Sequence, residues 1–118
     1  NNPSVIFAYL YGSCLDSDSF QDVDIAVYST DESDPFRLSI ELKIALAEDT
    51  ELPPEIFDVR VINHLLDKGD MFALLYLKEV LSKGKLLVDK NFSERSKYIE
   101  SFSMKYRQCE GLIAEVLA

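Results

Sequence analysis

Two apolar runs near the start of the chain, joined by a polar segment rich in aspartate, constrain the fold more than any other feature. Ser4–Tyr11 is rich in β-branched and aromatic residues and ends at Gly12, which is typical of a buried strand. Val23–Tyr28 is a second apolar run, and the polar residues of Cys14–Gln21 between the two are typical of a turn. The sequence therefore predicts two strands connected by a polar loop.

After the second strand, the sequence alternates between helical and strand patterns. Apolar residues three or four positions apart indicate helices, and short alternating apolar runs indicate strands. The predicted elements are a helix over 35–49, a strand over 56–62, a helix over 70–83, a strand over 85–88 and a helix over about 93–117. This β-β-α-β-α-β-α order predicts an α/β (α+β) domain with helices packed on a small mixed sheet. We expect a single domain over residues 1–118, because no linker or internal repeat divides the chain.

Two of the helices carry apolar stripes that predict their buried faces. The stripe of the helix over 35–49 is Phe36, Ile40, Ile44 and Ala47, widened by Leu42 and Leu46. The stripe of the last helix is Tyr98, Phe102, Tyr106, Cys109, Ile113 and Val116. We expect both stripes to face the core, and contact with a partner is the alternative for the last helix.

Charge is distributed unevenly along the chain. The net charge is −9, and residues 1–58 hold 13 of the 21 acidic side chains with only Arg37 and Lys43 as cations, whereas residues 59–118 sum to +2. An acidic surface repels phosphate backbones, so we predict no direct binding of nucleic acid. A nucleotide remains compatible, because a divalent cation can bridge carboxylates to phosphates. The alternative is that the excess acid only keeps the domain soluble.

Several classes of protein are disfavoured by composition. The longest apolar run, Met71–Leu77, is much shorter than the roughly 20 residues of a membrane-spanning helix. Two cysteines, Cys14 and Cys109, make no disulfide framework, and a single histidine excludes a zinc site built on histidines. We therefore expect a cytoplasmic protein without membrane contact. The chain begins at Asn1 rather than Met, so a short N-terminal helix could precede it.

Three aspartates lie where strands are predicted. Asp22 and Asp24 open the second strand and share a face, because alternate residues of a strand point the same way. Asp58 lies in the next predicted strand, with Phe57 and Val59 on the opposite face. Carboxylates held close together repel, and oxygen ligands suit Mg²⁺. Three such groups from adjacent strands could hold two metal ions about 3.5–4 Å apart for phosphoryl transfer.

An Asp-x-Asp pair alone is a weak signal, since 11 of the 118 residues are aspartate and Asp16-Ser17-Asp18 is a second such pair. A calcium-binding EF-hand loop counted from Asp16 would need glycine at Gln21 and glutamate at Val27, so this alternative fails. The specific signal is the conjunction of an apolar strand, Gly-Ser, a loop, Asp-x-Asp opening a second strand, and a further aspartate within a strand.

In this conjunction the run AYLYGSCLDSDSFQDVDIAVY resembles the signature of the DNA polymerase β nucleotidyltransferase superfamily. It is most similar to the minimal nucleotidyltransferase (MNT) domains of prokaryotic toxin–antitoxin pairs, and VLSKGKLLVDKNFSERSKYIESFSMKY resembles the tail of that family. The resemblance implies that Gly12 and Ser13 grip the triphosphate and that Asp22 and Asp24 bind metal. It also implies that Asp58 completes the metal site and helps to activate the acceptor hydroxyl.

The function implied by the resemblance is Mg²⁺-dependent transfer of a nucleotide, AMP from ATP, to a tyrosine of a HEPN-type helical toxin, with this chain as the antitoxin. One departure is that Cys14-Leu15-Asp16 stands where family members often carry an arginine, and no cation precedes Arg37. The alternatives are an antitoxin of the same fold that acts by contact alone and a small-molecule nucleotidyltransferase, the latter weakened by the lack of a second domain. Nucleotide preference, acceptor identity and homo-oligomer formation are left open.

Overall fold

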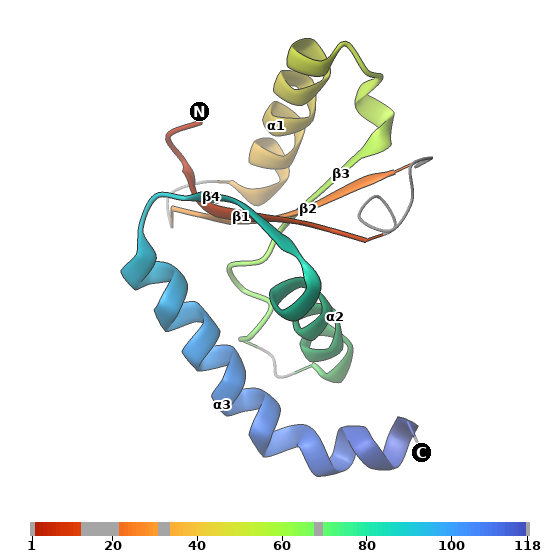
Figure 1. The fold of residues 1–118 in the computed structure, drawn as a ribbon, viewed down its shortest axis with the longest axis vertical. Helices are drawn as coiled ribbons and strands as arrows, with labels where there is room; N and C mark the ends of the chain where they lie inside the picture. The colour runs from red at the N-terminus through yellow and green to blue at the C-terminus, as the bar shows by residue number, and fades with distance from the viewer. Residues whose placement is uncertain (1, 13–21, 31–33, 68–69, 118) are drawn as a thin grey trace.

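The protein is described by a computed structural model that covers residues 2–12, 22–30, 34–67 and 70–117 (Figure 1). The predicted order of strands and helices is confirmed, and Ser13 and the predicted turn at Cys14–Gln21 lie outside the described residues. The elements are β1 (Val5–Tyr11), β2 (Val23–Ser29), α1 (Pro35–Thr50), the short 3-10 helix η2 (Pro54–Ile56), β3 (Phe57–Val61), α2 (Met71–Lys83), β4 (Lys85–Asp89) and α3 (Phe92–Leu117). Among the elements of the described residues, η2 alone has no counterpart in the prediction.

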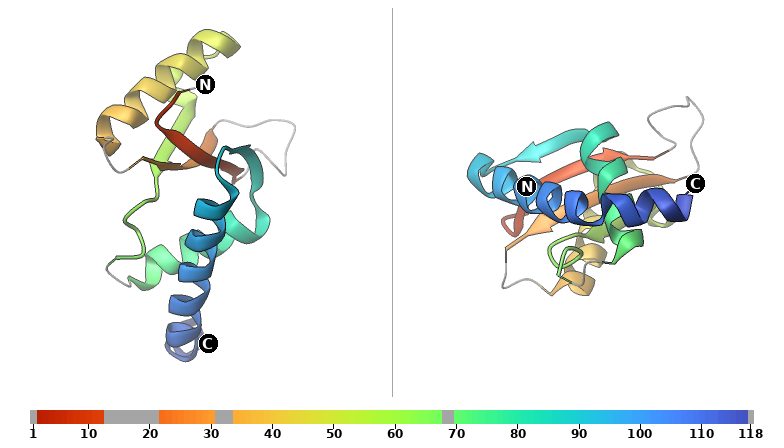
Figure 2. Two further views of the ribbon diagram at one scale, coloured as in Figure 1. Left: turned by 90° about the vertical axis from the view of Figure 1, so that its left-hand side faces the viewer. Right: turned by 90° about the horizontal axis from the view of Figure 1, so that it is seen from below.

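The four strands form one mixed sheet in the order β3-β2-β1-β4. β1 runs antiparallel to both β2 and β4, whereas β2 and β3 are parallel. Helix α1 covers one face of the sheet, and α2 and α3 cover the other face (Figures 1 and 2). The predicted fold class, a small mixed sheet with helices packed on it, is therefore confirmed. No helix in the described part of the chain has the length and apolar character needed to cross a bilayer.

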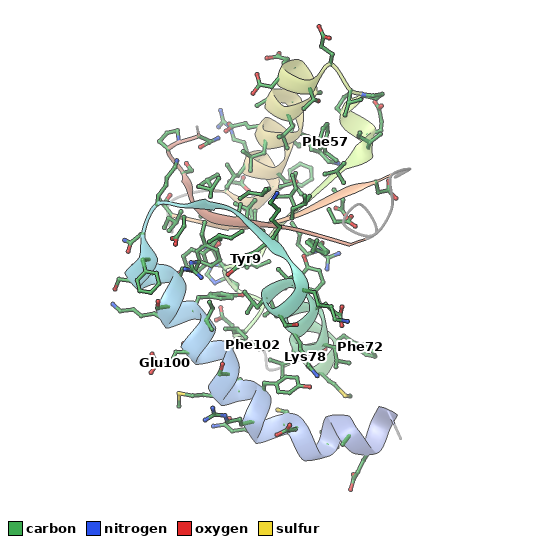
Figure 3. The ribbon with its side chains drawn as sticks, in the orientation of Figure 1. Tyr9, Phe57, Phe72, Lys78, Glu100 and Phe102 are labelled. Carbon is green, nitrogen blue, oxygen red and sulfur yellow. The ribbon has the colours of Figure 1, made fainter. Side chains whose placement is uncertain are left out.

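Alternation along the strands produces two cores, one on each face of the sheet. Figure 3 shows Phe57 between the sheet and α1, Tyr9 on the opposite face, and Phe102 between α3 and α2. The core on the α1 side consists of Val5, Ala8, Ile25, Val27, Leu38, Phe57 and Val59. The core on the α2 side consists of Phe7, Tyr9, Ala26, Ile62, Leu66, Leu74, Leu77, Val80, Tyr98 and Phe102.

The predicted buried stripe of α1 is correct for Leu42, Leu46 and Ala47 and wrong for Phe36, Ile40 and Ile44. The helix starts where the Asp34 side chain accepts a hydrogen bond from the Phe36 amide at 3.0 Å. The exposed fractions of Phe36, Ile40 and Ile44 are 76%, 42% and 51%, whereas Leu38 is only 3% exposed and packs with Leu42, Leu46 and Ala47 in the core. Both sets recur every four residues on neighbouring faces, so spacing alone does not distinguish them. The rotation is fixed by packing against β3, where the Ser39 hydroxyl donates to the Val59 carbonyl at 2.8 Å.

The predicted stripe of α3 is correct where the structure describes it. Tyr98 and Phe102 are buried, and Tyr106 and Cys109 pack at the margin of the same core. The Tyr98 hydroxyl donates to the Ile62 carbonyl at 2.7 Å, which ties α3 to the segment after β3. The side chains of Ile113 and Val116 lie outside the described part of the chain, and the C-terminal turns of α3 stand away from the sheet (Figure 2).

Candidate functional site

Acidic side chains gather at one edge of the sheet, where β1 ends and β2 and β3 begin. In the parallel pairing of β2 with β3, Asp24 lies directly opposite Asp58. Their neighbours Ile25 and Val59 are buried on the α1 side, so both carboxylates project from the other face. Asp22 immediately precedes β2 and is close enough for its charge to act on Asp24. The structure thus brings all three predicted carboxylates to one edge.

Gly12 lies against the Asp24 carboxylate at the end of β1. Its neighbour Tyr11 pairs with Asp24 across the antiparallel β1–β2 ladder. Gly12 has a φ of 90°, a left-handed conformation that favours glycine. A methyl group at this position would lie 3.2 Å from the Asp24 Cγ and would overlap its Oδ2 atom. Only glycine therefore lets the β1 backbone approach this carboxylate, whereas Ser13, the other predicted phosphate-binding residue, lies outside the described residues.

The electrostatics of this edge favour a bound cation. Partial burial raises the pKa of Asp24, and the charges of Asp58 and Asp22 raise it further, while Arg60 opposes the increase. The carboxylates are oxygen donors of the kind that suit Mg²⁺. Within the described ranges, however, no three acidic, cysteine or histidine side chains are spaced as a ready-made set of metal ligands. The donor chemistry fits a divalent cation, and the ligand roles of Asp22, Asp24 and Asp58 stay predictions.

The site also contains three residues that the sequence analysis did not single out: Tyr11, Arg60 and Tyr76. The Tyr76 hydroxyl, from α2, donates to the Tyr11 hydroxyl at 2.7 Å, and the two rings meet edge to face. The Arg60 guanidinium lies 4.7 Å from the centre of the Tyr76 ring. Burial raises the pKa of both tyrosines, so their hydroxyls stay protonated at neutral pH. Alternation with Asp58 along β3 could have indicated Arg60, but nothing in the sequence indicates that α2 turns Tyr76 towards it.

An apolar cavity lies on the opposite face of the sheet. Its volume is about 170 Å³, and it lies between α1 and the sheet, with Leu42, Leu46 and Val88 in its wall. Asp24 and Asp58 project from the other face, so this cavity is not part of the acidic site.

Comparison with known proteins identifies the family of the chain. The family described as "Polymerase beta, Nucleotidyltransferase" matches residues 1–93. The chain belongs to this nucleotidyltransferase family. The resemblance drawn from the Gly-Ser and Asp-x-Asp residues is thereby confirmed. No curated protein sequence gives a significant match to the chain.

Solved structures of toxin–antitoxin complexes contain chains with the same fold as this chain. A chain of a toxin–antitoxin structure with AMP-PNP is 22% identical, with a TM-score of 0.62, and the match covers 100% of our chain and 90% of that one. A chain of the tri-AMPylated Shewanella oneidensis HEPN toxin in complex with MNT antitoxin is 23% identical, with a TM-score of 0.57 and coverage of 98% and 86%. A chain of the MntA-HepT toxin–antitoxin structure is 21% identical, with a TM-score of 0.57 and coverage of 100% and 88%. At this identity the matches establish a shared fold.

Proposed function

We propose that residues 1–118 act as a single minimal nucleotidyltransferase domain that transfers AMP from ATP to a hydroxyl group. The observation that carries this proposal is that Asp24 lies opposite Asp58 in the sheet, at the edge where the backbone of Gly12 approaches the Asp24 carboxylate closely. The membership of the chain in a nucleotidyltransferase family gives the reaction class. We assign Asp22, Asp24 and Asp58 as ligands of Mg²⁺, with two ions bound during the reaction.

Each residue of the site has a chemical role in this proposal. Gly12 and Ser13 receive the triphosphate, since a glycine without a side chain lets phosphate oxygens approach the backbone amides. Mg²⁺, when bound by the three aspartates, would neutralise the charge on the reacting phosphate. Asp58 takes the proton of the acceptor hydroxyl while the hydroxyl oxygen forms a bond to the α-phosphorus. The bond between the α-phosphorus and the oxygen that bridges it to the β-phosphate then breaks, and pyrophosphate leaves.

We propose a tyrosine of a HEPN-type helical toxin as the acceptor, with this chain as the antitoxin and the cytoplasm as the place of the reaction. Support comes from the structural neighbours, which include an AMPylated HEPN toxin with its MNT antitoxin and a complex with an ATP analogue. The acidic charge of residues 1–58 supports a protein acceptor rather than a nucleic acid.

Label transfer from α-labelled ATP tests the proposal. The chain would be incubated with Mg²⁺ and a HEPN-type protein, and label on that protein would be measured. Asp24→Asn keeps the size of the side chain but removes a charged ligand, so transfer should fall by at least about a hundredfold. Glu100 lies on an exposed part of α3 (Figure 3), so the control variant Glu100→Gln should leave transfer unchanged. If Asp24→Asn transfers label as well as the parent chain does, the assignment of Asp24 as a metal ligand of the active site is wrong.

A second candidate function is neutralisation of the toxin by contact alone. The exposed apolar residues Phe36, Ile40 and Ile44 along α1 favour it, because they offer a surface that a partner could cover. The two functions predict different results in cells that express the toxin, where the protection given by Asp24→Asn is compared with that given by the parent chain. If Asp24→Asn protects those cells as well as the parent chain does, contact rather than transfer is the function.

A further inference from the structure

Arg60 places a cation on the acidic face of the sheet. Phe57 and Val59 are buried on the α1 side of β3, so Asp58 and Arg60 alternate with them and project from the other face. Across the parallel ladder, Arg60 lies opposite Ala26, which has no polar side chain. The arginine is therefore two residues along the strand from Asp58, on the same side.

Aromatic contacts hold the guanidinium in position. It lies 4.7 Å from the centre of the Tyr76 ring, within the range of a cation–π interaction. Tyr76 is in turn fixed by its 2.7 Å hydrogen bond to Tyr11, the residue before Gly12. Arg60 is thus linked through two tyrosines to the end of β1, where the triphosphate is proposed to bind.

The guanidinium is available to a ligand. Among the described residues, it forms no hydrogen bond or ion pair, although its positive charge acts on Asp24. The two cations of residues 1–58 are not alternatives, since Arg37 and Lys43 belong to α1 on the other side of the sheet, and Arg37 pairs with Glu41 at 3.2 Å. The planar guanidinium presents several N–H groups in a geometry that matches phosphate oxygens.

We propose that Arg60 binds a phosphate group of the nucleotide and supplies the cation that the segment after Ser13 lacks. This inference rests on the proposed function. The Tyr76 ring and the Tyr11 hydroxyl are the positioning residues that hold the guanidinium on the acidic face. In this proposal Arg60, on β3, takes the place of the arginine that family members often carry after Gly-Ser.

Binding measurements on Arg60→Gln and Arg60→Lys test the inference. The dissociation constants would be measured calorimetrically for ATP with saturating Mg²⁺, and separately for Mn²⁺ alone by electron paramagnetic resonance. Arg60→Gln should weaken ATP binding about tenfold or more, because it removes a charge-assisted contact to phosphate. It should leave Mn²⁺ binding unchanged or stronger, since a cation near the carboxylates has been removed. Arg60→Lys keeps the positive charge but lacks the planar guanidinium, so its loss of ATP affinity should lie between those of the parent and Arg60→Gln.

Arg37→Gln is the matched control, because it changes the net charge equally on the α1 side and should alter neither constant. Equal ATP affinity in Arg60→Gln and the parent would overturn the inference. A joint loss of ATP and Mn²⁺ binding in that variant would also overturn it, because the arginine would then support the site only structurally. A parent chain that binds neither Mn²⁺ nor Mg-ATP would instead remove the proposed function itself.

Discussion

Gly12 is the residue whose backbone most directly shapes the acidic edge. Its φ of 90° and its contact with the Asp24 carboxylate leave no room for a side chain. We expect Gly12→Ala to lower the free energy of unfolding by about 1–3 kcal/mol, the cost of a strained backbone and a displaced carboxylate. The measurement is urea denaturation followed by circular dichroism.

Gly111 provides the control for this substitution. It lies on an exposed part of α3, and a methyl group there would meet nothing within 4 Å. Gly111→Ala should stabilise the chain by about 0.5–1 kcal/mol, because alanine favours the helix. Equal effects of the two substitutions would contradict the close approach of Gly12 to Asp24.

Asp24 makes the stability of the metal-free chain depend on pH. Partial burial, Asp58 and Asp22 raise its pKa, so the folded chain holds this proton more tightly than the unfolded chain does. The resulting stabilisation is complete below the pKa of the unfolded chain, about 3.9, and is lost as the pH rises through the higher pKa of the folded chain. Asp24→Asn cannot titrate. The free energy of unfolding of this variant minus that of the parent, both measured in EDTA, should therefore increase as the pH rises from about 4 to neutrality. If this difference between variant and parent stays constant or decreases with pH, the pKa of Asp24 is not raised in the folded chain.

At the scale of single elements, the buried face of α1 is the feature that sequence spacing predicted only in part. Leu38 is 3% exposed in the core, whereas Ile40 is 42% exposed. Leu38→Ala should cost about 2–5 kcal/mol through lost burial and a cavity. Ile40→Ala should cost less than about 1 kcal/mol. Paired denaturation curves check this order, and a larger loss for Ile40→Ala would favour the stripe predicted from sequence.

The attachment of α3 can be tested at its buried tyrosine. The Tyr98 hydroxyl donates to the Ile62 carbonyl at 2.7 Å, and the Leu65 amide also donates to that carbonyl at 3.3 Å. Because one donor remains, Tyr98→Phe should lower the free energy of unfolding by only about 1 kcal/mol. Tyr106→Phe, two turns further along α3, should change it by less than about 0.5 kcal/mol, since its partner Lys78 is exposed. Equal losses would argue against the Tyr98 hydrogen bond.

For the molecule as a whole, charge and ligand binding are linked. Residues 1–58 are strongly acidic, so ATP alone should bind poorly, whereas Mg²⁺ should allow its phosphates to approach. ATP with Mg²⁺ at 100 times the dissociation constant should add about 2.7 kcal/mol to the free energy of unfolding. Differential scanning fluorimetry would show this as a higher Tm. ATP in EDTA should give almost no shift, and an equal shift with EDTA would contradict the proposed metal site.

The sequence by itself determined the order of the elements and the division of each strand into two faces. Alternation around Val23–Ser29 and Phe57–Val61 was enough to separate the aspartates from the apolar residues, because side chains in a strand point to opposite faces in turn. Family membership could also be read from the Gly-Ser and Asp-x-Asp residues, since these are local patterns.

Only the tertiary structure decided which helix faces are buried and which side chains complete the acidic edge. The apolar rows of α1 have the same spacing, and docking on β3 through Ser39 selects between them. Tyr76 reaches Tyr11 across 65 positions of sequence, and the Arg60 guanidinium lies over the Tyr76 ring only because α2 packs over that face of the sheet. Such contacts depend on the rotation and placement of whole helices, which the packing of the two cores sets and no local pattern contains.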